Sequence, residues 1–169
     1  MKKKVVVKVV LAGDGGVGKT TILHRYIHGN FSEFTKMTIG LEFFLKELDI
    51  DGTHVTIQLW DFGGQEQFQF LHHSYIEGAK GAVLMYDLTR PSTLEHLDYW
   101  VKLCKNGGYD MPIVFVGSKK DIVDELCIQD KLIEQILEDY NFCDYFETSS
   151  KTGENVEQVF TTLIRHILD

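Results

Sequence analysis

The sequence is short of the residue types that mark several specialised classes of protein. It has only two prolines and three cysteines in 169 residues, and Cys104, Cys127 and Cys143 lack the spacing of metal ligands. A disulfide scaffold is therefore excluded, and we interpret the cysteines as reduced, mostly buried residues of a cytoplasmic protein. No apolar run reaches the roughly 18 residues that a membrane span needs, and no signal peptide opens the chain.

Basic residues are in the minority, because 17 Lys and Arg stand against 25 Asp and Glu and give a net charge of -8. Nucleic acid is not an expected partner, since binding its phosphates requires a basic surface. Residues 1–4 are locally basic and are interpreted as a solvated tail, with contact to a membrane surface as the alternative.

Lipid attachment is not evident in this chain. Residue 2 is Lys rather than Gly, and the chain closes on Ile167-Leu168-Asp169 without a cysteine that could be prenylated. Either the protein carries no lipid, or a lipidated tail lies beyond this sequence and would hold a cytoplasmic protein at the periphery of a membrane.

What the chain does contain is an alternation of apolar runs and amphipathic segments. Residues 5–12 form a nearly continuous β-branched run, typical of a strand buried on both faces, and a glycine-rich loop and a helix through residue 28 follow. Asp51-Gly52 predicts a β-hairpin between two further strands. More strands are expected at residues 81–87, 113–116 and 145–146, and more helices near residues 94–104, 128–140 and 156–167.

This alternation predicts one α/β domain over residues 1–169, with a mostly parallel sheet, one antiparallel edge strand and helices on both faces. The apolar pattern of the helix near residues 128–140 consists of Ile128, Leu132, Ile136, Leu137 and Tyr140.

The glycine-rich loop, residues 13–18, is followed directly by Lys19 and Thr20 and fits the full phosphate-binding pattern. Its glycines allow consecutive backbone N–H groups to turn towards an anion at the start of a helix. Lys19 can reach the β- and γ-phosphates of a nucleotide, and the Thr20 hydroxyl can bind Mg²⁺. A phosphate loop alone does not choose between ATP and GTP, so a P-loop kinase or ATPase stays open at this point.

The sequence resembles the Ras-like small GTPases, with a leaning towards the Rab branch. The resemblance rests on Thr38-Ile39-Gly40, on residues 60–66, and on residues 118–121 together with 149–151. The resemblance covers essentially the whole chain. Gly63-Gly64-Gln65 is closer to the Arf branch. The resemblance implies a P-loop NTPase G domain with a six-stranded sheet and about five helices.

The resemblance also implies a role for each matching residue in GTP hydrolysis. Thr38 would close on Mg²⁺ and the γ-phosphate, and Asp61 would hold Mg²⁺ through water. The Gly64 amide would contact the γ-phosphate, Gln65 would orient the attacking water, and Lys19 would stabilise the transferring phosphoryl group. No arginine lies within residues 31–38, so we expect slow turnover that depends on an activating partner.

Guanine specificity is expected from Asp121, which can accept two hydrogen bonds that adenine cannot donate. The Lys119 stem would cover the base, the Ser150 amide would meet its O6 atom, and Phe31 would flank it. Ser118 departs from the asparagine of the family, and its hydroxyl can replace at most one of that residue's contacts. The expected nucleotide contacts are Gly13, Asp14, Gly15, Gly16, Val17, Gly18, Lys19, Thr20, Thr21, Phe31, Thr35, Thr38, Gly64, Ser118, Lys119, Asp121, Ser149, Ser150 and Lys151; Thr20, Thr38 and Asp61 are the expected metal ligands.

Five other side chains invite a functional interpretation. Phe43, Trp60 and Tyr75 resemble the aromatic triad with which Rab proteins contact effectors, and ordinary packing is the alternative. His72 and His73 are interpreted as exposed residues rather than metal ligands, because adjacent helical residues point in different directions.

The sequence therefore predicts a monomeric GTP-binding switch in membrane traffic or signalling, with GTP or GDP and Mg²⁺ as ligands and exchange factors, activating proteins and effectors as partners. One alternative is a nucleotide-binding module with little hydrolysis, which Ser118 favours and Gln65 and Gly15 oppose. Asp121 and the spacing of Thr38 from Thr20 oppose a P-loop kinase or ATPase.

Overall fold

One six-stranded sheet forms the centre of the molecule. The computed structural model describes residues 1–32, 41–63, 69–105, 110–123 and 130–169. The strand order is β2-β3-β1-β4-β5-β6; β2 runs antiparallel to β3, and the other neighbours are parallel. The predicted sheet with an antiparallel edge strand is thus confirmed. The strands are β1 (Lys3–Ala12), β2 (Leu41–Ile50), β3 (Thr53–Phe62), β4 (Gly81–Asp87), β5 (Ile113–Ser118) and β6 (Asp144–Glu147).

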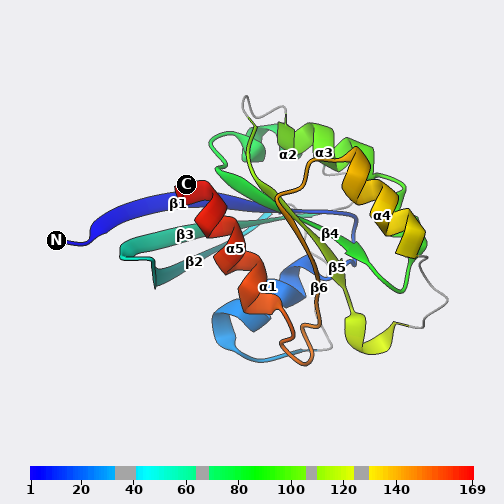
Figure 1. Cartoon of the computed structure of the whole chain (residues 1–169), viewed down its shortest axis with the longest axis horizontal. Helices are drawn as coiled ribbons and strands as arrows, with labels where there is room; N and C mark the ends of the chain where they lie inside the picture. Colours follow the sequence, from blue (N-terminus) through cyan, green and yellow to red (C-terminus); the bar gives the residue numbers. More distant parts are fainter. Residues whose placement is uncertain (33–40, 64–68, 106–109, 124–129) are drawn as a thin grey trace.

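Helices cover both faces of this sheet, as predicted. One face packs against α1 and α5, and the other against α2, α3 and α4 (Figure 1). The helices are α1 (Lys19–His28), α2 (Gln69–Ile76), α3 (Leu97–Lys105), α4 (Asp130–Asp139) and α5 (Val156–Leu168), with short 3-10 turns η2 (Pro91–Leu94) and η3 (Lys120–Ile122). None of the helices in the described part of the chain is long and apolar enough to cross a membrane.

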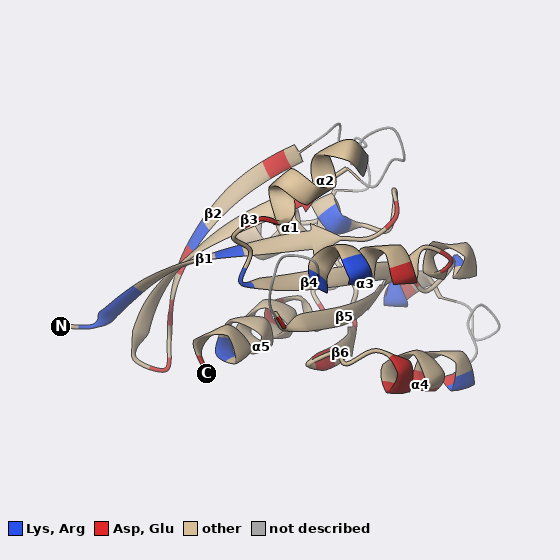
Figure 2. Cartoon of the chain, turned by 90° about the horizontal axis from the view of Figure 1, so that it is seen from above, with Lys and Arg blue, Asp and Glu red and all other residues tan. Residues whose placement is uncertain are grey.

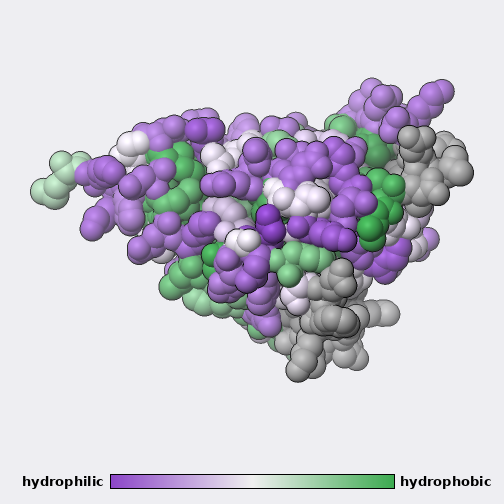
Figure 3. Space-filling model, turned by 90° about the horizontal axis from the view of Figure 1, so that it is seen from below, coloured by the Kyte–Doolittle hydropathy of each residue, from purple (hydrophilic) through white to green (hydrophobic). Residues whose placement is uncertain are grey.

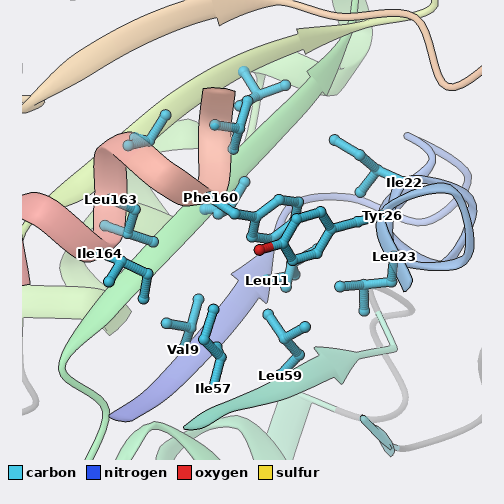
Figure 4. Close-up of a cluster of buried hydrophobic side chains, with 14 of the residues drawn as sticks. Val9, Leu11, Ile22, Leu23, Tyr26, Ile57, Leu59, Phe160, Leu163 and Ile164 are labelled. Atoms are coloured by element: carbon cyan, nitrogen blue, oxygen red, sulfur yellow. The ribbon is translucent and has the colours of Figure 1, made fainter. Parts of the chain in front are cut away.

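The core beneath α1 and α5 fixes the helix that follows the glycine-rich loop. Tyr26 of α1 stacks on Phe160 of α5, with ring centroids 4.0 Å apart and planes 13° from parallel (Figure 4). Both rings lie over apolar side chains of β1 and β3. Because α1 packs against both the sheet and α5, the loop between β1 and α1 is held at both ends.

The β2–β3 hairpin turns on Asp51 and Gly52, as the sequence predicts. Their φ angles are +48° and +82°, the left-handed conformation that a two-residue hairpin turn requires. Arg165 of α5 donates from Nε to Asp51 Oδ2 at 3.0 Å, which ties the turn to the last helix.

One sequence interpretation of the fold was wrong, and one helix packs in a way that its sequence did not indicate. The basic start of the chain is part of a strand and not a tail, because β1 begins at Lys3 (Figure 2). Lys3 and Lys4 pair with Thr53 and His54, the first residues of β3. In α4, Ile133 and Ile136 are buried, whereas Leu132 and Leu137 are 46% and 36% exposed. The apolar residues of α4 span more than one face, so their spacing alone did not select the side that packs on the sheet.

The cysteine interpretation holds for two of the three residues. Cys104 is buried and Cys143 half-buried, and both are free thiols. Burial raises the pKa of Cys104 to about 12, which keeps its thiol protonated and unreactive. Cys127 lies outside the described residues.

The five parallel strands end at the same edge of the sheet, and most of the predicted site residues lie there. Gly13 follows β1, Asp61 lies at the end of β3, Asp87 ends β4 and Ser118 ends β5. Ligands of open α/β sheets bind outside the carboxyl ends of such strands. The topology therefore gathers residues from across the whole sequence at one site.

Phe160→Ala should lower the free energy of unfolding by about 3–5 kcal/mol, because it removes a fully buried ring and leaves a cavity against Tyr26. Equilibrium urea unfolding measures the loss. The matched control is Phe70→Ala, since Phe70 is 74% exposed. The control should change stability by no more than about 0.5 kcal/mol. Equal losses in the two variants would contradict the assigned core.

Candidate functional site

The glycine-rich loop joins β1 to α1 and takes a conformation that only glycine adopts readily. Gly16 and Gly18 have φ angles of +76° and +101°. Gly13 has a φ angle of +137°, and a Cβ there would lie 2.3 Å from the carbonyl oxygen of Met85 on β4. The loop therefore starts pressed against the sheet and enters α1 directly, as the phosphate-binding pattern predicts.

Lys19 lies across the loop. It is the first residue of α1, it is only 6% exposed, and its Nζ atom donates to the carbonyl oxygens of Gly13 at 2.7 Å and Asp14 at 3.0 Å. Burial lowers the pKa of Lys19 to about 8, although the carboxylates of Asp61 and Asp14 partly oppose this. A buried cation held in a loop of backbone amides is suited to binding an anion such as a phosphate.

Thr20 and Asp61 lie side by side next to Lys19. The Thr20 hydroxyl donates to Asp61 Oδ2, and Asp61 is fully buried at the end of β3. A hydroxyl and a carboxylate are hard oxygen donors, so the pair fits Mg²⁺. No cluster of three or more His, Cys, Asp or Glu that could hold a metal ion occurs among the described residues. A magnesium ion here would therefore need further oxygen ligands, such as those of a phosphate.

Helix α3 and the residues just before it make hydrogen bonds to the glycine-rich loop. Trp100 donates from Nε1 to Asp14 Oδ1 at 2.9 Å, and His96 Nδ1 lies 2.9 Å from Asp14 Oδ2. Arg90 Nη2 donates to the carbonyl oxygen of Gly15 at 3.3 Å. The carboxylate of Asp14, a predicted nucleotide contact, thus binds α3. Sequence reasoning missed these contacts, because Arg90, His96 and Trp100 lie more than 70 positions from the loop.

Asp87 is the charged centre that holds two cations against the same loop. Its buried Oδ2 lies 2.7 Å from Lys119 Nζ and 3.0 Å from Arg90 Nε, and Thr89 donates to Oδ1. Burial alone would raise the pKa of Asp87, but the hydrogen bonds from Lys119, Thr89 and Arg90 outweigh it and lower the pKa below its ordinary value. Lys119 Nζ also donates to the carbonyl oxygen of Gly16 at 3.0 Å. An ionised Asp87 therefore fixes Lys119 beside the loop.

Ser118, where the chain departs from the asparagine of the Ras-like pattern, lies against the same loop. It is only 4% exposed, and its hydroxyl can donate to Val17 O at 2.5 Å or to Tyr86 O at 3.0 Å. A hydroxyl has one proton, so it makes one of these bonds at a time. The side chain therefore ties the segment 118–121 to the phosphate loop.

The two segments predicted to read the base lie together at the ends of β5 and β6. Ser149 donates from its hydroxyl to Asp121 Oδ1 at 2.8 Å, and Lys120 Nζ lies 2.8 Å from Glu154 Oε1. Asp121 and Lys151 are exposed, and Ser150 is half-buried. A carboxylate held by a buried serine at this edge is available to accept hydrogen bonds from a ligand.

Several predicted site residues cannot be placed. Thr35, Thr38, Gly64 and Gln65 lie outside the described residues, so their roles stay predictions. Phe31 is described and is half-buried.

The interpretation of His72 was wrong. Its side chain is 1% exposed, with Nε2 3.0 Å from Gly63 O and Nδ1 3.0 Å from the Tyr99 hydroxyl. His73 is exposed, as expected. The sequence does hold a signal, because His72 lies four positions before the buried Ile76 and so shares its helical face.

The three aromatic residues that resemble an effector triad contact one another. Phe43 packs edge-on against Trp60, with ring centroids 5.3 Å apart. The ring centroids of Trp60 and Tyr75 are 6.1 Å apart. Phe43 is 47% exposed, and Leu45 on the same strand is 55% exposed. The described part of the face drawn in Figure 3 is mostly hydrophilic, with separate apolar patches.

Comparison with known proteins shows the family to which the chain belongs. Residues 8–169 match the family model described as Ras family. The chain is 40% identical to the Ras-related protein Rab-7a of Dictyostelium discoideum, over 99% of this chain and 85% of that protein. It is 35% identical to Rab7 of Drosophila melanogaster, over 99% and 83%, and 35% identical to Rab-19 of Homo sapiens, over 95% and 75%. The chain therefore belongs to the Ras family, as a small GTPase of the Rab branch.

Ser118→Ala should speed the release of bound GDP about threefold to tenfold, because it removes the hydrogen bond that ties segment 118–121 to the loop. Release of a fluorescent GDP analogue after excess unlabelled GDP is added gives the rate. Ser92→Ala, at an exposed position of η2, is the control and should release GDP at the wild-type rate. Wild-type release from Ser118→Ala would show that the tie is not needed for retention.

Proposed function

We propose that this protein is a molecular switch that binds GTP or GDP, hydrolyses GTP with Mg²⁺ and acts in membrane traffic. The observation that supports this most directly is the buried Lys19 ammonium, held within the phosphate loop beside the Thr20–Asp61 pair. Membership of the Rab branch favours traffic over other forms of signalling.

One part of the site would bind the phosphates of the nucleotide, and another part would bind its base. The loop amides and Lys19 would hold the β- and γ-phosphates through charge-assisted hydrogen bonds. Asp121 would accept hydrogen bonds from the ring N1–H and the exocyclic amine of guanine, and adenine has neither donor in that arrangement. The hydrogen bond from Ser149 to Asp121 supports this role, because it holds the carboxylate in one orientation. Lys119, fixed by Asp87, would cover the face of the base.

Hydrolysis would proceed by attack of water on the γ-phosphate. Thr20, Asp61 and Thr38 would hold Mg²⁺, which would neutralise charge on the phosphate oxygens. Gln65 would orient the water, and Lys19 would stabilise the charge that develops on the transferring group.

Slow turnover is expected, because Arg90, an arginine that contacts the phosphate loop, is already bound to other groups. The guanidinium of Arg90 is bound to Asp87 and to the Gly15 carbonyl oxygen, so it stabilises the loop. An activating partner would then supply the missing positive charge. Binding of the γ-phosphate to Thr38 and the Gly64 amide would change the segments around them, where exchange factors, activating proteins and effectors would bind a monomer. The exposed Phe43 beside Trp60 suits such an effector contact.

Gln65→Leu should reduce the single-turnover rate of GTP hydrolysis about tenfold or more, a barrier increase of about 1.4 kcal/mol. GTP affinity should be nearly unchanged, because the side chain acts on the water. Phosphate release from preloaded protein measures the rate, and Gln135→Leu on the exposed face of α4 is the control. A wild-type protein that binds GTP without hydrolysing it would be a binding module instead, which would contradict the proposal.

A further inference from the structure

His72 is a buried titratable residue that the proposed mechanism does not use. It lies on α2 beneath the last described residues after β3, where its ring stacks on Phe62 with centroids 5.7 Å apart and planes 18° from parallel. Two rings of α3 also contact it, with the Trp100 centroid 5.0 Å and the Tyr99 centroid 6.2 Å from that of His72. The ring therefore lies where β3, α2 and α3 meet.

One of the two hydrogen bonds of this ring fixes the place of a proton. Gly63 O can only accept, so Nε2 at 3.0 Å must carry a proton and donate to it. In the neutral ring Nδ1 is then an acceptor, and the Tyr99 hydroxyl at 3.0 Å donates to it. Every polar atom of the contact is satisfied in that arrangement.

Charge around the ring favours the same neutral form. Burial lowers the pKa of His72, the hydrogen bond to Gly63 opposes this, and electrostatic interactions with Lys19 and His73 lower the pKa further. The neutral side chain of Tyr99 faces it from α3, and the aromatic rings of Phe62 and Trp100 complete its surroundings. At neutral pH the ring is therefore uncharged and keeps the donor that Gly63 requires.

The Gly63 carbonyl belongs to the same peptide group as the amide N–H of residue 64. A peptide group is planar and trans, so its C=O and N–H point in opposite directions and rotate together. Fixing the carbonyl oxygen of Gly63 therefore fixes the direction in which that N–H points. Glycine at both positions leaves the peptide free to rotate unless something holds it.

We propose that His72 is a positioning residue for recognition of the γ-phosphate, because its Nε2–H holds the peptide whose amide contacts that phosphate. This inference rests on the proposed function, which gives the Gly64 amide that contact. His72 touches neither nucleotide nor metal in this account. It acts through the Gly63 peptide, and α3 acts on it in turn through Tyr99.

The test compares GTP with GDP, because only GTP has a γ-phosphate. His72→Phe keeps an aromatic ring against Phe62 and Trp100 and removes both nitrogens. Release of a fluorescent, non-hydrolysable GTP analogue should become about threefold to tenfold faster, the effect of one lost hydrogen bond. Release of the matching GDP analogue should change by less than about twofold. His73→Phe, the same substitution at the exposed neighbour, should alter neither rate.

A rescue variant separates positioning from packing. His72→Gln carries a side-chain amide N–H that can replace the Nε2 donor, and it should restore much of the wild-type ratio of the two release rates. Equal acceleration of GTP and GDP release in His72→Phe would show a structural role only and overturn the inference. An unchanged ratio in His72→Phe would also overturn it, as would a glutamine variant that matches the phenylalanine one. If the wild-type protein binds neither nucleotide, the proposed function itself fails.

Discussion

The arrangement of the candidate site at the carboxyl ends of the parallel strands depends on one constraint. The Lys19 ammonium is buried inside the glycine-rich loop, where it donates to backbone carbonyl oxygens. A buried cation is costly unless oxygen atoms surround it, and here two loop carbonyls and the nearby carboxylate of Asp61 do so. This arrangement needs a loop that folds back on itself, which the left-handed glycines allow. It also needs the loop to be held from outside, and Asp87, Trp100 and Ser118 each supply part of that support.

The parts that could be predicted from the sequence are those encoded by neighbouring residues. The phosphate loop, the helix that starts at Lys19 and the Asp51-Gly52 turn each depend on a few consecutive positions, and the structure has them as expected. The parallel direction of most strands followed from the alternation of buried runs with helices, whereas the order of the strands in the sheet was not predicted. The contact of Ser149 with Asp121 joins two segments that the resemblance to small GTPases had assigned to one task.

The rest could not be predicted, because it depends on side chains that meet only in the folded chain. Asp87 gave no local sign that it would bind Lys119, and the spacing of His72 from Ile76 indicated a shared face but not the partners of the ring. The loop contacts of Trp100 and the bridge from His72 to Tyr99 are of this kind as well. Together they join α2, α3 and the phosphate loop into one network around the site, so a change on α3 can act on the loop without touching a ligand.

The central claim is that this edge of the sheet binds a guanine nucleotide. The most direct measurement is displacement of a fluorescent GDP analogue from the purified protein by unlabelled GDP, GTP, ADP and ATP. We expect GDP and GTP to displace it at concentrations about a hundredfold or more below those of ADP and ATP, because adenine would leave the Asp121 carboxylate without its donors. Equal displacement by adenine and guanine nucleotides would contradict the account.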